Sequence, residues 1–472
     1  MMAQHDPSGL VARLAAQRAA YSQERWPTLA VRRDRLKRLR ALTREHGTAI
    51  AASIDADFGG RSAHETRLAK LFLVAAAISH AESHLRRWTR PRRVATAARF
   101  WPARNRLLPQ PLGVVGIVAP WNYPFQLSIG PAVAAIAAGN RVMLKPSELT
   151  PHFSELLARL VAGLFDPDEL HVVTGGVEVG RAFVALPFDH LFFTGSTAVG
   201  RQVAMAAAAN LTPVTLELGG KSPAILDPSA DMTQAARRIA FGKLLNAGQT
   251  CIAPDYLMVP RGSTAKMSSD LGDAIRSLYP TISDNPDYSA IISDGHRDRL
   301  AALVQDACDK GAAVVEPVRV DLATNARKMA PTLLLGVNAS MRVMQEEIFG
   351  PILPIIEYDG LDEAIAHVTA GERPLALYWF GTDARSRERV LRETHAGGVT
   401  VNDCLWHLAQ EDQPFGGIGA SGTGSYHGEW GFRTFSHFKP ILHQPAVAGT
   451  RFFQPPYGKT FDAMLGALQK LI

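Results

Sequence analysis

Four short apolar runs, each followed by a segment with helical spacing, constrain the fold more than any other feature of this sequence. The runs cover residues 114–118, 141–145, 171–174 and 190–194. Strands that alternate with helices at this spacing pair in parallel, because each helix carries the chain back across one face of the sheet. We therefore predict an α/β fold with a doubly wound, Rossmann-like sheet between residues 111 and 210.

A second alternating series begins near residue 212 and ends near residue 420, with apolar runs at 256–259, 313–315, 352–356 and 375–380. A chain of 472 residues is too long for one compact domain. We expect one domain from residues 1–90 and 112–216, the first part of which is helical, and a second α/β domain from residues 217–420.

Three segments lie outside both series. Residues 91–111 and 421–450 contain Pro, Gly and aromatic residues in a pattern typical of extended structure. Residues 451–472 form a tail with an apolar helical stripe made of Phe461, Met464, Leu465, Leu468 and Leu471. A helix docked on the rest of the chain is the simpler interpretation. The alternative is a helix that lies on a membrane surface or covers an active site.

The formal net charge of +6 raises the question of an anionic partner such as nucleic acid. The Arg-rich run at residues 32–40 is interleaved with apolar residues, which is typical of a solvated helix face. No zinc-finger spacing or RNA-recognition motif accompanies it. We therefore expect no nucleic-acid partner.

The three cysteines, Cys251, Cys308 and Cys404, are widely spaced and odd in number, unlike a disulfide framework. No spacing of the His-Glu-x-x-His type indicates a metal site. The sequence has no apolar stretch of membrane-spanning length and no signal-peptide core. We expect no metal, no membrane span and a cytoplasmic protein.

Cys251 is the first candidate for chemistry. It follows Gly248, Gln249 and Thr250 directly after a helical segment at 234–245. Backbone N–H groups in such a turn lower a thiol pKa and can hold an oxyanion. Most buried cysteines are inert, so this motif alone leaves a purely structural role open.

Glu217 is the second candidate, because it lies in an apolar strand that stops at Gly219 and Gly220. A buried carboxylate is costly unless it is used or paired. Burial also raises its pKa towards the range of a general base. A structural ion pair with Lys221 is the alternative.

Asn122 lies in the segment Pro120-Trp121-Asn122-Tyr123-Pro124, directly after the first predicted strand. Ligands bind at this end of the strands in parallel sheets. The Asn122 amide could donate a hydrogen bond to an oxyanion, or the segment could be a simple turn.

Two further strand ends carry polar residues. Gly195, followed by Ser196 and Thr197 and five residues later by Gly200, opens a helix whose free N–H groups suit a phosphate; a plain helix cap is the alternative. Lys145 and Glu148 could bind ribose hydroxyls, or Glu148 could belong to a capping box.

Taken together and in this order, these segments resemble the aldehyde dehydrogenase superfamily over roughly residues 10–445. Two later segments, 345–351 and 414–422, resemble it as well. Within the superfamily the chain is most similar to the class 3 branch, through residues 112–148, 246–256 and 426–437. The bacterial coniferyl aldehyde dehydrogenases are the most similar group.

The resemblance implies the oxidation of an aldehyde to the carboxylic acid. Cys251 would attack the carbonyl carbon, and Asn122 with the Cys251 backbone amide would stabilise the oxyanion. Hydride transfer to a nicotinamide would leave a thioester, which water activated by Glu217 would hydrolyse. A nucleophile, an oxyanion donor and a base that converge on one atom are what this chemistry needs.

The resemblance also implies a dinucleotide site in the first domain and catalysis in the second. Glu148, which would hold the adenine ribose with Lys145, favours NAD over NADP, although NADP stays possible. The cofactor-binding residues would be Pro120, Trp121, Lys145, Glu148, Gly195, Ser196, Thr197, Gly200, Leu218, Glu347 and Phe349. Residues 91–111 and 421–450 would form an arm that joins two chains into a homodimer.

Three other activities compete with this one. In a CoA-acylating aldehyde dehydrogenase, CoA would take the acyl group in place of water, but such enzymes typically lack a base at the position of Glu217. A non-catalytic binding protein would lack Cys251, Glu217 or Asn122. A cysteine hydrolase would need a histidine paired with the cysteine, and no sequence feature indicates such a residue. The substrate is not fixed: Tyr123, Trp406 and Phe432 could line a pocket for an aromatic or apolar aldehyde, or could be core residues.

Overall fold

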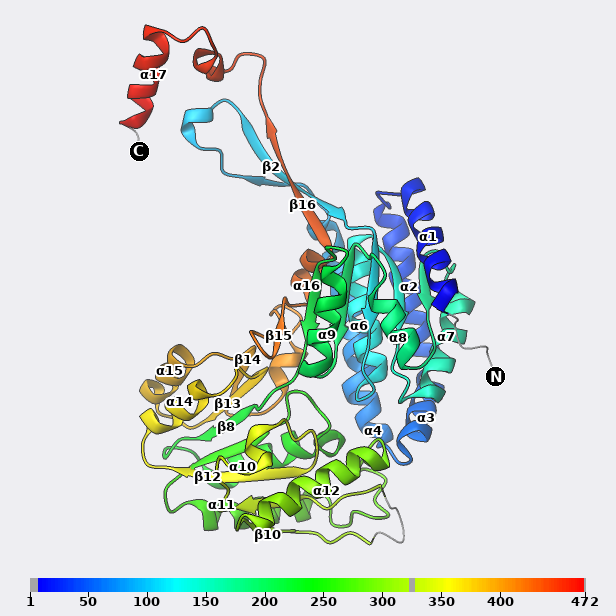
Figure 1. Cartoon of the computed structure of the whole chain (residues 1–472), viewed down its shortest axis with the longest axis vertical. Helices are drawn as coiled ribbons and strands as arrows, with labels where there is room; N and C mark the ends of the chain where they lie inside the picture. Colours follow the sequence, from blue (N-terminus) through cyan, green and yellow to red (C-terminus); the bar gives the residue numbers. More distant parts are fainter. Residues whose placement is uncertain (1–6, 322–326, 471–472) are drawn as a thin grey trace.

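The computed structural model describes residues 7–321 and 327–470. Within them the chain forms three β-sheets with helices packed around two of them, and the third sheet projects as an arm (Figure 1). The mixed α/β fold class predicted from the sequence is confirmed.

The six-stranded sheet contains the first alternating series. Its order is β15-β7-β6-β3-β4-β5, and only the pair β15–β7 is antiparallel. The strands are β3 (Val114–Val118), β4 (Arg141–Lys145), β5 (Leu170–Val172), β6 (His190–Thr194), β7 (Val214–Glu217) and β15 (Gly422–Thr423). The crossover helices are α6 (Pro124–Ala138), α7 (Pro151–Leu164), α8 (Val177–Val184) and α9 (Thr197–Ala208). Strand order reverses at β3, which is where open parallel sheets bind ligands.

Helices from the N-terminal part of the chain cover this sheet (Figure 1). They are α1 (Pro7–Gln23), α2 (Leu29–Glu45), α3 (Gly47–Phe58), α4 (Ala63–Thr66) and α5 (Leu73–Trp88), with a π-helical turn η1 (Arg67–Phe72) before α5. Helix α2 contacts α5, α6 and α7, and α1 contacts α8. Helix α2 therefore packs against several helices, and this packing can bury some of its basic residues.

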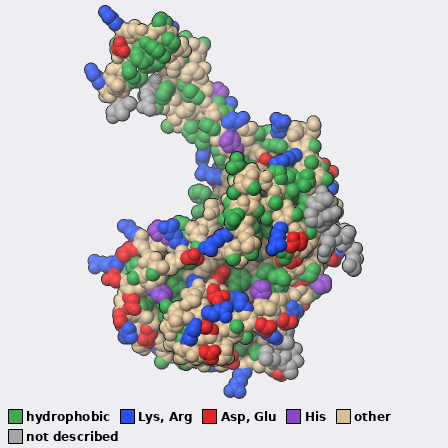
Figure 2. Space-filling model, in the orientation of Figure 1, with side chains coloured by type: hydrophobic (Ala, Val, Ile, Leu, Met, Phe, Trp, Pro, Cys, Tyr) green, Lys and Arg blue, Asp and Glu red, His purple; other side chains and the backbone are tan. Residues whose placement is uncertain are grey.

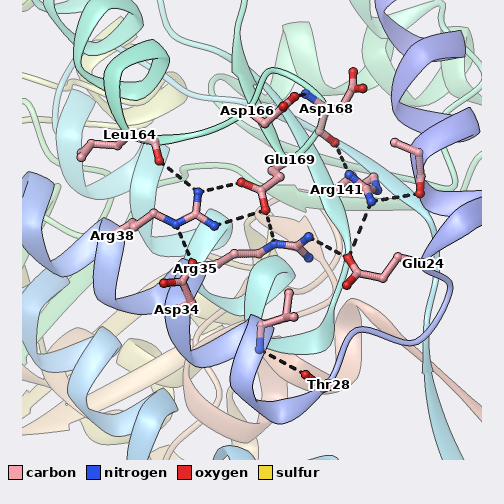
Figure 3. Close-up of polar contacts among 12 residues, drawn as sticks. Glu24, Thr28, Asp34, Arg35, Arg38, Arg141, Leu164, Asp166, Asp168 and Glu169 are labelled. Carbon is pink, nitrogen blue, oxygen red and sulfur yellow. Dashed lines mark hydrogen bonds and ion pairs between the residues drawn. The ribbon is translucent and has the colours of Figure 1, made fainter.

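The prediction that the basic run at 32–40 is a solvated helix face is wrong for its most buried members. Arg32 and Arg35 are 2% and 4% exposed. Arg32 donates hydrogen bonds to the last two carbonyls of α6. Arg35 donates to Glu169 at 2.8 Å and to Glu24 at 2.9 Å (Figure 3). These arginines are buried because carbonyl and carboxylate oxygens of neighbouring elements satisfy their N–H groups.

The seven-stranded sheet contains the second alternating series. Its order is β10-β11-β12-β9-β8-β13-β14, and only β10 runs antiparallel to its neighbour. The strands are β8 (Pro223–Leu226), β9 (Tyr256–Pro260), β10 (Ala313–Val315), β11 (Thr332–Leu335), β12 (Ile352–Tyr358), β13 (Ala376–Phe380) and β14 (Gly398–Val401). The helices are α10 (Met232–Leu244), η3 (Leu245–Gly248), α11 (Thr264–Leu278), α12 (Asp294–Asp309), α13 (Arg342–Gln345), α14 (Leu361–Ala370), α15 (Ala384–Glu393) and η4 (Trp406–Ala409).

The arm is an antiparallel sheet in the order β1-β2-β16. Its elements are β1 (Arg92–Val94), the short turn η2 (Ala98–Phe100), β2 (Arg104–Pro111) and β16 (Ser436–His443). Only part of the predicted arm segment 421–450 belongs to it. Strand β15 pairs with β7, and α16 (Gly428–Thr434) packs on α5 and α6. Gly422 allows this close pairing, because a Cβ there would lie 2.2 Å from the carbonyl oxygen of Leu216.

The C-terminal tail forms the turn η5 (Gly449–Phe453) and the predicted helix, α17 (Lys459–Gln469). Phe461 packs against Phe453 and Tyr457, with ring centroids 6.1 and 4.9 Å apart. None of the residues of α17 is buried, so the tail helix does not dock on the body of the same chain as the simpler interpretation expected. Leu471, the last residue of the predicted stripe, lies outside the described residues.

Figure 2 shows the arm standing clear of the body, with apolar side chains gathered near its tip. In the part of the chain that the structure describes, no helix has the length and apolar character needed to cross a membrane.

Candidate active site

A cavity of about 790 Å³ opens where the six-stranded and seven-stranded sheets meet. It is lined by residues that follow β3, β6 and β7, together with residues of the second series. The predicted site residues in its wall are Pro120, Trp121, Asn122, Gly195, Ser196, Thr197, Glu217, Leu218, Cys251, Glu347 and Phe349. The structure thus brings together most of the residues chosen from the sequence.

Cys251 lies at the end of residues 246–251, which follow α10 and which we call the nucleophile loop after the role predicted for Cys251 from the sequence. Burial, together with the charges of Glu347 and Glu217, raises the pKa of the Cys251 thiol to about 12. The backbone N–H groups of Cys251 and Ile252 oppose this rise by hydrogen bonding to the thiolate. All three cysteines of the chain are free, so no disulfide competes for this thiol.

Cys251 also lines a second pocket, which is apolar. Tyr123 and Trp406 lie in the wall of this pocket, as do Phe72 and Phe241. Phe432, the third aromatic residue considered for such a pocket, is instead a core residue packed against Trp88. Cys251 therefore lines both the larger cavity, whose wall also contains charged and polar side chains, and the apolar pocket.

Glu217 is the last residue of β7 and is 2% exposed. Both of its carboxylate oxygens are buried without a hydrogen-bond partner among the described residues. Burial raises its pKa well above the ordinary value. The alternative of an ion pair with Lys221 is wrong, because Lys221 bonds to Asp255 and to the Val343 and Glu346 carbonyls. A buried carboxylate without a partner is suited to accept a proton.

Asn122 lies in residues 120–124, which connect β3 to α6 and which we call the oxyanion turn after the role predicted for Asn122 from the sequence. Its side-chain amide donates to the backbone carbonyl of Gln249 at 3.2 Å. Gln249 belongs to the nucleophile loop, so the Asn122 amide is held next to Cys251. The turn also places Trp121 against Phe349, with ring centroids 5.4 Å apart.

Glu347 lines the same cavity as Glu217, and burial raises its pKa to about 8. Its carboxylate rests on Gly219: a Cβ at that position would lie 2.2 Å from the Glu347 Oε1 atom. The absence of a side chain at position 219 is thus explained by the close approach of a second carboxylate. Phe349, two residues further on, has a left-handed backbone with φ of 53°.

The helix start after β6 is in part a plain helix cap. Ser196 is the N-cap of α9 and accepts from the Val199 N–H, while the Gly195 N–H donates to the Glu217 carbonyl at 3.0 Å. The Gly195 amide is therefore engaged within the protein. Gly200 lies outside the cavity wall, and its missing Cβ makes room for the Leu218 side chain.

Lys145 and Glu148 also lie outside the wall of the cavity. Lys145, at the end of β4, is 2% exposed, and its Nζ atom lies 3.4 Å from the Glu148 carboxylate. Burial lowers the pKa of Lys145, and Glu148 opposes that shift. No group of three or more His, Cys, Asp or Glu side chains within residues 7–321 and 327–470 could hold a metal ion.

The family model of the aldehyde dehydrogenase family matches residues 9–441. The chain is 50% identical over 462 residues to a probable coniferyl aldehyde dehydrogenase of Pseudomonas aeruginosa, an alignment that covers 98% of this chain and 96% of that protein. The chain belongs to the aldehyde dehydrogenase family. It is an oxidoreductase that oxidises aldehydes with NAD(P).

Other relatives agree with the class 3-like branch. The dehydrogenase is 47% identical to a coniferyl aldehyde dehydrogenase of Pseudomonas sp. over 93% of this chain and 92% of that protein. It is 41% identical to aldehyde dehydrogenase family 3 member A2 of Pongo abelii over 90% of this chain and 86% of that protein. A solved structure, the substrate-bound state of Staphylococcus aureus AldH, matches with a TM-score of 0.92 at 38% identity, covering 97% of this chain and 99% of that chain.

The cavity of the dehydrogenase has the polar groups that a dinucleotide needs. The Thr194 hydroxyl lines it and is buried without a partner among the described residues. Thr197 and Ala198 begin α9, where N–H groups have no intrahelical acceptor. Glu347 offers a carboxylate for hydroxyl groups, and Leu218 supplies apolar surface.

Sequence reasoning missed two buried charged residues, Arg61 and Glu65, which contact the oxyanion turn and the nucleophile loop. Ser62 is the N-cap of α4 and accepts from the Glu65 N–H. In the sequence this pattern reads as a helix start, and no local signal shows that the two charges reach the active site.

Proposed function

We propose that Cys251 is the nucleophile of this dehydrogenase, with Glu217 as general base and Asn122 as oxyanion donor. The observation that supports this most directly is that Cys251 lines both an apolar pocket and the larger cavity that also contains Glu217. An aldehyde can reach the sulfur from the apolar pocket while the cofactor occupies the larger cavity.

Cys251, Asn122 and Glu217 act at different steps of the reaction. The Cys251 thiol first releases its proton to solvent, and the thiolate then attacks the carbonyl carbon. The resulting oxyanion accepts hydrogen bonds from the Asn122 amide and the Cys251 backbone N–H. A bound nicotinamide supplies the hydride acceptor. Loss of hydride converts the tetrahedral adduct into a thioester on Cys251. Glu217 then takes a proton from water, and the hydroxide that forms releases the acid and restores the thiolate.

The experiment that tests this assignment compares wild-type enzyme with Cys251→Ala and Cys404→Ala. Cys404 is fully buried away from both cavities and serves as the matched cysteine control. We expect aldehyde-dependent NADH formation to be abolished only in the Cys251 variant. Unchanged NADH formation in Cys251→Ala would contradict the assignment.

We propose that the cofactor site comprises the predicted cavity-lining residues, with Lys145 and Glu148 at its rim and Glu347 at the nicotinamide ribose. NAD is the preferred cofactor, because the half-exposed Glu148 carboxylate would repel a 2′-phosphate. Glu148→Gln keeps the shape and removes the charge. It should lower the KM for NADP more than the KM for NAD, which steady-state kinetics with both cofactors would show.

The substrate we propose is an aromatic or other apolar aldehyde, with coniferyl aldehyde as one candidate. Two relatives carry that substrate in their names, and the pocket beside Cys251 is lined almost entirely by apolar side chains. A panel of aliphatic, benzylic and cinnamyl aldehydes would rank the preference. A higher kcat/KM for short aliphatic aldehydes than for cinnamyl aldehydes would contradict it.

Water, and not CoA, is the proposed acyl acceptor, because Glu217 is present and buried beside the thiol. Analysis of the product in the presence and absence of CoA distinguishes the two. Free acid in both reactions supports hydrolysis, and acyl-CoA formation that depends on CoA contradicts it.

We also propose a homodimer joined through the arm, in a reducing compartment such as the cytoplasm. The free state of all three cysteines supports the compartment. The exposed apolar side chains of the arm support the dimer.

A further inference from the structure

Two buried, oppositely charged side chains from one N-terminal segment reach both catalytic loops. Arg61 and Glu65 lie just before and within α4 and are 4% and 9% exposed. The loops they contact lie about 60 and 180 residues further along the chain. Charged residues of this kind are seldom buried without a specific partner.

Arg61 holds the oxyanion turn. Its Nη1 atom donates to the backbone carbonyl of Asn122 at 2.8 Å. The guanidinium also lies over the rings of Phe58 and Tyr123, at 4.6 and 5.1 Å from their centroids. Contacts from both its edge and its face fix the guanidinium, and through it the peptide that follows Asn122.

Glu65 holds the nucleophile loop at its most strained point. The Asn246 N–H lies 3.1 Å from both Glu65 oxygens, and the Ser289 hydroxyl donates to the carboxylate at 3.0 Å. Asn246 and Ala247 have left-handed backbones with φ of 56° and 51°. Such conformations persist only where the surroundings over-determine them, and a charged acceptor at the Asn246 N–H does so.

The two loops are also tied to each other through shared carbonyls. The Asn246 side-chain amide donates to the Gln249 carbonyl at 2.9 Å and to the Asn122 carbonyl at 3.3 Å. The Asn122 amide donates to the same Gln249 carbonyl. A shift of either loop would therefore break bonds of the other.

We infer that Arg61 and Glu65 are positioning residues, which clamp the nucleophile loop to the oxyanion turn and so set the placement of the Cys251 sulfur relative to the Asn122 amide. This inference rests on the proposed roles of Cys251 and Asn122. Neither charged residue touches the substrate in this account; each acts through the loop that it holds. Displacement of a reacting group by about 1 Å costs on the order of 100-fold in rate.

The test uses the pairs Glu65→Ala with Glu65→Gln and Arg61→Met with Arg61→Lys. In the Ala and Met variants we expect kcat to fall on the order of 10- to 100-fold. The KM for NAD should stay within about twofold, because neither Arg61 nor Glu65 lines the cofactor cavity. The Gln and Lys variants keep one acceptor or one donor and should recover part of the loss.

A second readout needs neither substrate nor cofactor. The rate at which iodoacetamide alkylates Cys251, followed by peptide mapping across a pH series, reports the environment of the thiol directly. The pH profile should shift in Glu65→Ala and Arg61→Met and return towards wild type in the conservative variants. This readout separates the clamp from the catalytic assignment, which Cys251→Ala tests through turnover.

Arg35→Met is the matched control, because Arg35 is a buried arginine like Arg61 but pairs with Glu24 and Glu169, away from both loops. It should lower thermal stability without changing the alkylation profile. If Glu65→Ala proves insoluble, Ser289→Ala removes one bond to the same carboxylate and should shift the profile in the same direction. Wild-type kcat and alkylation in the folded Arg61 and Glu65 variants, or an equal change in Arg35→Met, would overturn the inference.

Discussion

At the residue scale, two carboxylates with raised pKa values face one thiol. Glu217 has buried oxygens without a described partner, whereas Glu347 rests on Gly219 and accepts the Gly220 N–H. The difference in their contacts separates their roles. A carboxylate with free lone pairs can take a proton from water, and one with a fixed orientation can hold a hydroxyl group of a ligand.

The pH dependence of turnover should report Glu217. The residue acts as a base only when ionised, and burial raises its pKa well above the ordinary value. Activity should therefore fall as pH drops through this raised pKa, far above the pH at which an exposed glutamate would protonate. Glu217→Gln should lower kcat by about 100- to 10,000-fold and abolish this acid limb in a pH–rate profile. An acid limb that persists unchanged in the variant would assign it to another group.

The Gly219 position should tolerate no side chain. A Cβ there would lie 2.2 to 2.5 Å from the Glu347 carboxylate group, so Gly219→Ala must displace that carboxylate. We expect the KM for NAD to rise by about tenfold, the change that corresponds to ~1.4 kcal/mol of lost binding. Gly466→Ala, in the exposed tail where the added Cβ meets nothing, is the control. Equal kinetics for the two variants would disprove a role for the Glu347 position.

At the scale of elements, helix α2 shows how a basic segment becomes part of the core. Arg35 and Arg38 both bond to Glu169, which lies in the turn before β5 (Figure 3). Their hydrogen bonds and charges lower the pKa of Glu169 to about 2, against the opposing effect of burial. The cluster therefore fastens the N-terminal helices to the edge of the six-stranded sheet.

Glu169→Gln should destabilise the protein in a pH-dependent way. The folded-state pKa of Glu169 lies below its ordinary value, so its contribution is complete above about pH 4.5 and disappears as pH falls towards about 2. At neutral pH the variant should melt about 5 °C lower than wild type, and the difference should shrink between pH 5 and pH 3. Calorimetric or fluorescence melts across that range would show it. A difference that is independent of pH would contradict the electrostatic account.

At the scale of the whole molecule, the arm leaves apolar surface without cover in a single chain. The exposed apolar side chains include Trp101 and Leu442 in the arm, and Val447 and Tyr457 in the segment that follows it. Strand β16 is also an edge of its sheet, and unpaired strand edges bind other chains. Both features are expected of a surface that meets a second copy of the protein.

Light scattering should therefore report twice the mass of one chain. The double variant Leu442→Asp with Val447→Asp places charge on the apolar surface of the arm and of the segment that follows it, and should shift the equilibrium to monomer at micromolar concentration. The control is the double variant Met205→Asp with Leu211→Asp, at two exposed residues of the body. It should leave the dimer intact. A wild-type monomer, or a dimer insensitive to the arm variant, would contradict the proposed role of the arm.

The sequence predicts the features that depend on local patterns of residues better than those that depend on contacts between distant segments. Strands β3, β4 and β6 could be predicted to the residue, because burial on both faces makes each a continuous apolar run. The burial of Arg32 and Arg35 could not, since helical periodicity does not show which helices lie on either side. The clamp formed by Arg61 and Glu65 was hidden for the same reason: its partners lie in distant segments, and its local pattern is that of a helix cap.

The central claim, that Cys251 carries the acyl group and Glu217 releases it, is tested most directly by trapping the intermediate. Glu217→Gln would be mixed with NAD and an aldehyde, quenched in acid and examined by intact-protein and peptide mass spectrometry. The account predicts that the protein gains the mass of the acyl group, that the adduct maps to Cys251, and that wild-type enzyme accumulates far less of it. An adduct on another residue, or no adduct in a variant that still reduces one equivalent of NAD, would contradict the account.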